Sequence, residues 1–187
     1  SSSGNIKWAR SYNGPSRIWG RSVAVDDSGY VYLTGAYNDS ISFDSVGFKH
    51  EKGIYDLFLT KLDANGKLVW AKRGGPENYY MRGHSLVTHG DTFYVEGLAI
   101  TENGYIETIQ LGDELYYSEF EYSNFLASYK TSGELNWVKI FKINNWSWPV
   151  YKLDTDPRGN IYAGGVFKDT IIIESHLIQG SGAEDFY

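Results

Sequence analysis

One pattern occurs three times along this chain, and it constrains the fold more than any other feature. Trp8, Trp70 and Trp137 occupy the same place in the segments IKWAR, LVWAK and LNWVK. A second segment, with tyrosine in its second position, recurs as VYLTG, FYVEG and IYAGG. The copies are 62 to 68 residues apart. A period of this length in a sequence of alternating apolar and polar residues is typical of an array of sheet units.

The first full copy predicts four antiparallel strands. Ser22–Val25 and Tyr30–Thr34 flank the turn DDSG. Asp56–Leu62 and Lys67–Arg73 flank the turn DANG in the same way. Alternating runs on either side of Gly-containing turns are typical of hairpins of half-buried strands. Between the two hairpins lies an insert, 38–55, in which SISF and VGFK are expected to form a small extra hairpin.

The repeat divides the chain, which we expect to be one β-propeller fragment over 1–187, into approximate units. Residues 1–19 match the last strand of a preceding unit, and three units follow at 20–75, 76–142 and 143–187, the last incomplete. The second unit contains a longer insert, which by its length is expected to have strands or a role of its own. Because both ends interrupt the repeat, we expect either a fragment of a larger array or an assembly that completes it.

Composition supports strands and argues against several classes of protein. Phe, Trp and Tyr make up 17% of the 187 residues, and there are 21 Gly, which favours strands and turns over helix bundles. A net charge of −6 argues against a nucleic-acid partner, which would require a basic surface. The absence of Cys excludes disulfides, thiolate metal sites and cysteine catalysis. No apolar run is long enough to predict a transmembrane helix.

The recurring residues resemble those of the bacterial beta-propeller repeat family called SBBP. The clearest copy runs from Gly20 to Gly35, continues from Asp56 to Gly66, and ends with Trp70-Ala71-Lys72. The third copy departs from the pattern, with Asp154 and Thr155 where Ala and Val are usual. The resemblance implies antiparallel propeller blades, in proteins of the bacterial cell surface or secreted space that mostly have no assigned activity.

The predicted fold class is therefore all-β, with about three four-stranded antiparallel blades in a partial or open propeller. Fewer than four blades do not close a ring, and stacking buries faces that each blade alone would expose. We expect Trp8, Trp70 and Trp137 to lie on outer strands and pack into the next blade, where each burial stabilises the fold by about 1.5–3 kcal/mol.

The sequence gives little support for metal or catalytic chemistry. The turns DDSG and DANG are similar to the start of a calcium loop, but they lack its later glutamate, and Asp or Asn before Gly commonly forms turns. The histidines lack the spacing of metal ligands: His50, His84, His89 and His176. Carboxylates such as Glu96 and Glu114 could pair across a cleft as in glycosidases, although a solvated surface explains them better. We predict no catalytic residue, metal ligand or cofactor.

Aromatic residues are concentrated where each Trp-containing strand connects to the next unit. If these segments are loops on one face of a propeller, their aromatic residues form a shared rim that suits sugar stacking or a protein partner. Alternatively, they fold back and cover the junctions between blades. The segments hold Tyr12, Ile18 and Trp19, then Tyr79, Tyr80 and Met81, then Trp146 and Trp148. The candidate binding residues are Trp19, Arg17, Tyr79, Tyr80, Arg82, Trp146 and Trp148.

These observations favour a non-catalytic scaffold or binding module of a bacterial cell-surface or secreted protein. Its partner would be a protein, a glycan or the remaining blades of a larger chain, and neither a nucleic acid nor a transmembrane segment is expected. One alternative is a glycan lyase or hydrolase, which would bring acidic, Tyr or His side chains with shifted pKa values to the central axis. Another is a structural subunit of a surface or secretion assembly.

Overall fold

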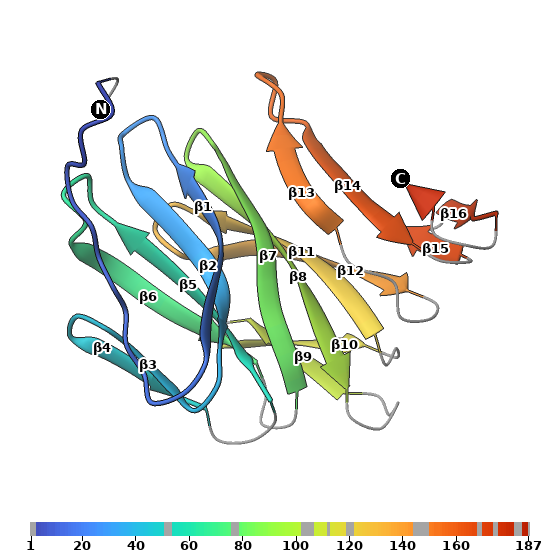
Figure 1. Ribbon diagram of the computed structural model, residues 1–187. Helices are drawn as coiled ribbons and strands as arrows, with labels where there is room; N and C mark the ends of the chain where they lie inside the picture. Colours follow the sequence, from blue (N-terminus) through green and yellow to red (C-terminus); the bar gives the residue numbers. More distant parts are fainter. Residues whose placement is uncertain are drawn as a thin grey trace.

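Antiparallel sheets make up the protein, and among the residues described below no helix occurs (Figure 1). The computed structural model describes residues 3–50, 54–75, 79–101, 107–111, 113–118, 122–143, 150–167, 170–173, 176–181 and 185–186. The predicted all-β class with antiparallel, propeller-like blades is confirmed, and the described strands do not close into a ring.

Blade 1 is a four-stranded sheet that continues into strands of the second insert. Its strands, in spatial order, are β1 (Ile18–Val25), β2 (Val31–Tyr37), β5 (Asp56–Leu62) and β6 (Leu68–Gly74). The insert between β2 and β5 forms the expected hairpin, β3 (Ser40–Phe43) and β4 (Val46–Lys49).

Blade 2 repeats this order with longer strands. It consists of β7 (Tyr79–His89), β8 (Thr92–Thr101), β11 (Tyr122–Lys130) and β12 (Leu135–Ile143). Its insert has strands of its own, as expected: β9 (Glu107–Leu111) and β10 (Glu114–Ser118).

Blade 3 is described in part. Its main strands are β13 (Val150–Thr155), β14 (Ile161–Phe167) and β17 (Asp185–Phe186). The corresponding insert hairpin is β15 (Thr170–Ile173) and β16 (His176–Gln179), which confirms the third copy of this feature.

Each insert hairpin reaches back to the preceding repeat unit. In blade 2, Leu111 of β9 pairs with Gly74, the last residue of β6 in blade 1. In blade 3, Ile172 of β15 pairs with Lys142 of β12 in blade 2. An isolated bridge connects β3 to the segment before β1 in the same manner. The inserts therefore fasten successive units together through backbone pairing, which the sequence pattern alone did not predict.

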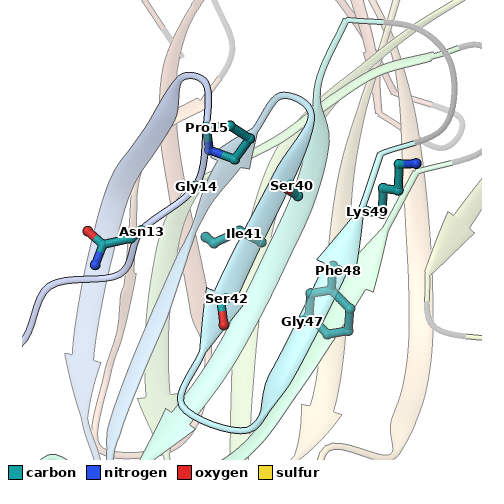
Figure 2. A pocket seen from close by; sticks show the side chains of 9 residues that line it. All are labelled: Asn13, Gly14, Pro15, Ser40, Ile41, Ser42, Gly47, Phe48 and Lys49. Carbon is teal, nitrogen blue, oxygen red and sulfur yellow. The ribbon is translucent and has the colours of Figure 1, made fainter.

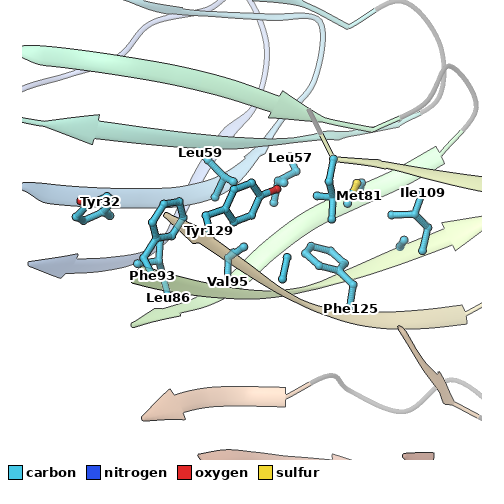
Figure 3. Close-up of a cluster of buried hydrophobic side chains, with 13 residues drawn as sticks. Tyr32, Leu57, Leu59, Met81, Leu86, Phe93, Val95, Ile109, Phe125 and Tyr129 are labelled. Atoms are coloured by element: carbon cyan, nitrogen blue, oxygen red, sulfur yellow. The ribbon is translucent and has the colours of Figure 1, made fainter. Parts of the chain in front are cut away.

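The main core lies between blades 1 and 2 (Figure 3). Phe93 of β8 is fully buried at the centre of a group of rings. Its centroid lies 4.9 Å from that of Tyr32, 5.1 Å from that of Tyr129 and 5.8 Å from that of Trp70. Because these rings come from both blades, their burial holds the two sheets face to face.

The indoles that recur at the same position of each repeat have a direct structural role. Trp8 Nε1 donates a hydrogen bond to the Ala64 carbonyl in the β5–β6 turn, at 3.0 Å. Trp70 Nε1 donates to the Thr131 carbonyl in the corresponding turn of blade 2, at 3.3 Å. A Cβ on Gly66 would lie 2.9 Å from the Trp8 ring, so the turn glycine makes room for the indole. The prediction that the tryptophans pack on the following blade is confirmed for Trp8 and Trp70.

Candidate functional site

The structure places the predicted loop aromatics Trp19, Tyr79 and Tyr80 in strands, whereas Tyr12 precedes β1 and lies outside any strand. Trp19 pairs with Ala36 within blade 1, and Tyr80 pairs with Ile100 within blade 2. The prediction of loop aromatics is therefore wrong for Ile18, Trp19 and Tyr79–Met81, because extended pairing begins earlier than the glycines that follow them suggested. The exposed Arg17 directly precedes β1. Trp146 and Trp148 lie outside the described residues.

Trp19 and Tyr80 meet through a third aromatic residue, Tyr55. The Trp19 ring stacks on Tyr55 with centroids 4.6 Å apart, and Tyr55 meets Tyr80 edge to face at 5.3 Å. The Tyr55 carbonyl accepts a hydrogen bond from the Met81 amide at 2.8 Å, which ties the end of the first insert to β7. The Met81 side chain is fully buried in the core. These aromatics therefore cover the junction between blades 1 and 2, the alternative that the sequence left open.

Two arginines extend this group of rings. The Arg21 guanidinium carbon lies 5.2 Å from the Trp19 ring centroid, and that of Arg82 lies 5.2 Å from the Tyr80 centroid. Arg82 Nη1 also donates to the Tyr80 hydroxyl at 2.9 Å. We call Trp19, Arg21, Tyr55, Tyr80 and Arg82 the arginine–aromatic cluster. Both arginines come from inner strands, β1 and β7, which pack side by side (Figure 1).

Beside this cluster lies a buried pair, His84 and Glu96, with His84 Nδ1 3.7 Å from Glu96 Oε2. Burial, followed by the charges of Arg82 and Arg21, lowers the His84 pKa to about 3. Burial raises the Glu96 pKa well above its ordinary value, although Arg82 opposes the shift. Neither ring nitrogen of His84 and neither carboxyl oxygen of Glu96 has a hydrogen-bond partner among the described residues. The expectation that Glu96 is solvated is wrong, because it is 0% exposed.

A second buried pair, His50 and Asp56, lies where the β3–β4 hairpin ends and β5 begins. His50 Nδ1 lies 3.0 Å from Asp56 Oδ1, and the Tyr37 hydroxyl donates to Asp56 Oδ2 at 3.2 Å. Burial raises the Asp56 pKa, and the contacts with His50 and Tyr37 oppose that shift. The Arg73 guanidinium donates to the Lys49 carbonyl at 2.9 Å nearby. This group joins the end of the β3–β4 hairpin to β5 and β6, so we assign it a structural role.

The acidic turns are stabilised by their own aspartates. Asp26 Oδ1 accepts the amides of Ser28 and Tyr30 at 3.0 and 2.9 Å. Asp63 and Asp156 accept amides two and four residues ahead in the same way. The interpretation of these residues as turn formers is confirmed. The described ranges contain no group of three His, Asp or Glu residues placed to hold a metal ion.

Two of the hollows on the described part of blade 1 are lined by none of the cluster residues. An open one of about 650 Å³ lies between the β3–β4 hairpin and the segment before β1 (Figure 2). Its lining includes Asn13, Pro15 and Phe48 but none of the candidate binding residues. An apolar groove of about 340 Å³ lies nearby, on side chains that include Trp8 and Leu33.

The antiparallel sheets repeat along the chain, and the insert hairpins of blades 2 and 3 pair with the last strand of the preceding blade. This arrangement is that of a propeller-like repeat protein. Residues 7–36 match the model of the SBBP beta-propeller repeat, which confirms for this segment the resemblance seen in the sequence. The match begins beside Trp8 and ends within β2, so it spans the boundary between one unit and the next. No curated protein matches the sequence. Within the described part of the chain, no helix has the length and apolar character needed to span a membrane.

Three residues at or beside the cluster were not among the candidate binding residues chosen from the sequence. Tyr55 precedes the repeated Asp56, and no pattern marks it. Arg21 and His84 occupy one repeat position, between Gly20 and Ser22 and between Gly83 and Ser85, where the register shifts in β1 and β7. A bulge redirects the side chain of its extra residue. A polar side chain at this repeat position, Arg21 in β1 and His84 in β7, was therefore the available sequence signal for the site.

Proposed function

We propose that this chain is a non-catalytic propeller module that serves as a scaffold and binding platform in a bacterial cell-surface or secreted protein. The arginine–aromatic cluster is its main contact site, and its partner is a protein or a glycan. The resemblance of the repeat to the SBBP family supports this location. The observation that carries the proposal is the meeting of Trp19, Tyr55 and Tyr80 with two arginines at the start of neighbouring inner strands.

The chemistry of the cluster supports a contact role. Trp, Tyr and Arg are the residues most enriched where binding energy is concentrated in interfaces. Trp19 and Tyr80 are half-buried, and Arg21 is exposed, so the cluster has a surface side. Four of its five residues lie on the paired strands β1 and β7, which hold them in position before any ligand arrives and so lower the entropic cost of binding.

The apolar groove on blade 1 supports the part of the proposal that concerns scaffolding. It is lined by side chains of β1 and β2, including Val23 and Leu33, together with Trp8. Val23, which lines this groove, is 59% exposed. A further blade of the same repeat would cover this face as blade 2 covers the opposite one. A role as structural subunit of a larger assembly remains compatible with this groove.

The contact role is tested by binding measurements on a panel of bacterial and host glycans, with affinities from calorimetry. The Trp19→Ala/Tyr80→Ala double variant should lose binding of every glycan that the unaltered chain binds. Tyr117→Ala is the matched control, because Tyr117 is 74% exposed on the β10 strand and lies outside the cluster. Circular dichroism and thermal melting confirm that each variant is folded. Equal binding by a folded double variant would remove the cluster as the contact site.

His84 and Glu96 are the observation that favours the alternative, a glycan lyase or hydrolase. Their shifted pKa values and their place beside the inner strands fit what such an enzyme requires. The Glu96 side chain is 1% exposed, so a substrate would reach it only if blades 2 and 3 separated. Release of reducing ends or unsaturated products from a polysaccharide panel, abolished by Glu96→Gln, would favour the enzyme over the binding module.

A further inference from the structure

The arginine–aromatic cluster carries positive charge that the described residues do not neutralise. Neither Arg21 nor Arg82 has a carboxylate within ion-pair distance in the described ranges. The Arg82 Nε is buried and has no hydrogen-bond partner there. Arg21 lies close enough to lower the pKa of Arg82, after the larger effect of burial. Two guanidinium groups held near each other without a counter-charge favour an anion between or beside them.

Glu96, the described acid whose charge acts on Arg82, does not supply that counter-charge. Glu96 contributes to the electrostatic environment of Arg82, yet it lies beyond ion-pair distance. Its burial favours the uncharged carboxyl, and within the described ranges its partner at ion-pair distance is His84, at 3.7 Å, rather than an arginine. Because an unpaired buried charge is costly, Glu96 is better described as a neutral group beside the cluster than as its counter-ion.

The aromatic rings position the guanidinium groups. The Arg21 guanidinium carbon lies over the Trp19 ring and that of Arg82 over the Tyr80 ring, each 5.2 Å from the ring centroid, so each group is held beside an aromatic ring. A guanidinium group has five N–H donors in a planar fork that matches two oxygens of one anion, and Arg82 uses one Nη1 donor on the Tyr80 hydroxyl. Trp19 already packs against Tyr55 and Arg21, so its ring is better placed to hold an arginine than to stack on a sugar.

The backbone directs Arg21 toward solvent. The register of β1 against β2 shifts between Gly20 and Ser22, and Arg21 is the extra residue at this shift. Bulges of this kind re-aim side chains and are common next to functional sites. Arg21 is exposed, whereas Arg82 is half-buried, so a ligand would meet Arg21 first and Arg82 at greater depth.

We propose that the arginine–aromatic cluster is an oxyanion-binding site, with Arg21 and Arg82 as its ligating residues and a carboxylate, sulfate or phosphate group as its ligand. This inference rests on the proposed function, since it names the chemistry of the partner that the same site contacts. The partner is then an acidic molecule, such as a uronic-acid or sulfated glycan, rather than a neutral one.

The test measures binding by calorimetry and by chemical-shift changes with four probes: inorganic sulfate, inorganic phosphate, an oligogalacturonate and a neutral galactose oligomer of equal length. We expect at least one oxyanion to bind, the neutral oligomer to bind at least tenfold more weakly, and the affinity to fall as salt is raised. Preference for the oligogalacturonate would identify a carboxylate as the ligand group, and preference for sulfate or phosphate would identify an ester group. An acidic peptide that outcompetes the oligogalacturonate would place the same group on a protein partner.

Arg21→Ala should weaken oxyanion binding at least tenfold, and Arg21→Lys should restore part of it because the charge returns without the fork. Arg82→Lys is used in place of Arg82→Ala, because removal of a half-buried side chain risks unfolding. Arg158→Ala is the matched control, since Arg158 is an exposed arginine in the β13–β14 turn, at the other end of the inner strands. Cluster-dependent binding of neutral glycans with no effect of Arg21→Ala would overturn the oxyanion site and leave the binding module intact. Binding unaffected by both the Trp19/Tyr80 and Arg21 variants would reject both.

Discussion

The two blade junctions have the same strand pattern and different chemistry. Blade 1 presents Thr34 and Leu57 to blade 2, and the rings around Phe93 fill the space between them. At the matching positions blade 2 presents Glu96 and Asn124 to blade 3, and both are buried with oxygens that lack partners in the described ranges. The comparison teaches that the repeat specifies how blades are placed, while individual substitutions decide how strongly they adhere.

Both junctions contain the same hydrogen bond, in which a serine hydroxyl oxygen of one inner strand accepts a backbone amide of the next inner strand. Ser22 Oγ accepts the Leu86 amide at 3.0 Å across the first junction. Ser85 Oγ accepts the Leu153 amide at 2.8 Å across the second. The same residue, one repeat apart, therefore sets the spacing of neighbouring inner strands. Since the hydrogen bonds are equivalent, the difference between the junctions must come from their side-chain packing.

The largest expected effect is at the centre of the apolar junction. Phe93→Ala should destabilise the protein by about 3–5 kcal/mol, because it removes a fully buried ring and leaves a cavity among three others. The matched variant is Ile161→Ala, at the same repeat position in blade 3, where the side chain is half-buried. Urea unfolding should show less than half the loss for Ile161→Ala. Similar losses would mean that the two junctions are equally well packed.

The second prediction concerns the charge in the polar junction. The folded-state pKa of Glu96 lies above its ordinary value of 4.5, so the folded protein holds this proton more tightly than the unfolded chain. Stability contributed by the neutral carboxyl is therefore complete below about pH 4.5 and is lost as the pH rises through the folded-state pKa. Glu96→Gln should stabilise the protein at pH 8, where the unaltered chain must keep a buried carboxyl protonated or charge it, and should have little effect near pH 4.

Thermal melts of the unaltered protein and of Glu96→Gln between pH 4 and 8 show whether the stabilisation by the substitution grows as the pH rises. His84 acts in the opposite direction, since its lowered pKa of about 3 means that the unfolded chain takes up a proton first on acidification. Above its ordinary pKa of 6.5, His84 is neutral in both the folded and the unfolded chain, so the difference between the two proteins from pH 6.5 to pH 8 reports the Glu96 carboxyl. Glu134→Gln is the control, because Glu134 is exposed and paired with Lys130. A stabilisation by Glu96→Gln that does not vary with pH would contradict the assignment of a raised pKa.

The sequence predicted the strands of each blade because their signals are local. Asp26 and Gly29 mark a turn through contacts within five residues, and the alternation on either side marks two strands. The pairing of Leu111 with Gly74 has no such signal, since it joins an insert to another blade. Local patterns therefore identified the hairpins of the inserts but not where those hairpins attach.

The candidate site was predicted in part for the same reason. Trp19, Tyr80 and Arg82 were chosen because aromatic and arginine residues are concentrated between the repeat units. The structure places them together at one junction. Their assignment to loops was wrong because strand pairing across the sheet, a long-range contact, extends β1 and β7 to include them. Glu96 was assigned to the surface because a lone glutamate in a strand gives no local sign of burial. Comparison with Thr34 at its repeat position would have identified it as an exception.

The third prediction compares the two serine contacts. Ser85→Ala should cost about 1–2 kcal/mol, because it leaves the buried Leu153 amide without its acceptor. Hydrogen exchange should show the loss chiefly as faster opening of β13 and β14, since blade 3 packs on blade 2 mainly through β13 on β7 and β8. Ser22→Ala should leave local opening of β13 and β14 unchanged and lower global stability instead, because blades 1 and 2 share one core. Equal protection changes in β13 for both variants would show that the junctions do not open independently.

The smallest expected effect separates the indole hydrogen bond from the packing of its ring. Trp70→Phe removes the Nε1 donor but keeps an aromatic ring against Phe93, and the Thr131 carbonyl retains its second donor, Lys61 Nζ, at 2.9 Å. The loss should therefore be about 0.5–1 kcal/mol, the ordinary net value of one hydrogen bond. Trp137→Phe is the matched change at the second junction, where the ring lies 6.1 Å from Tyr94 of its own sheet. Denaturant midpoints should fall less for Trp137→Phe than for Trp70→Phe, and the reverse order would show that the outer strand of blade 2 is held more firmly than that of blade 1.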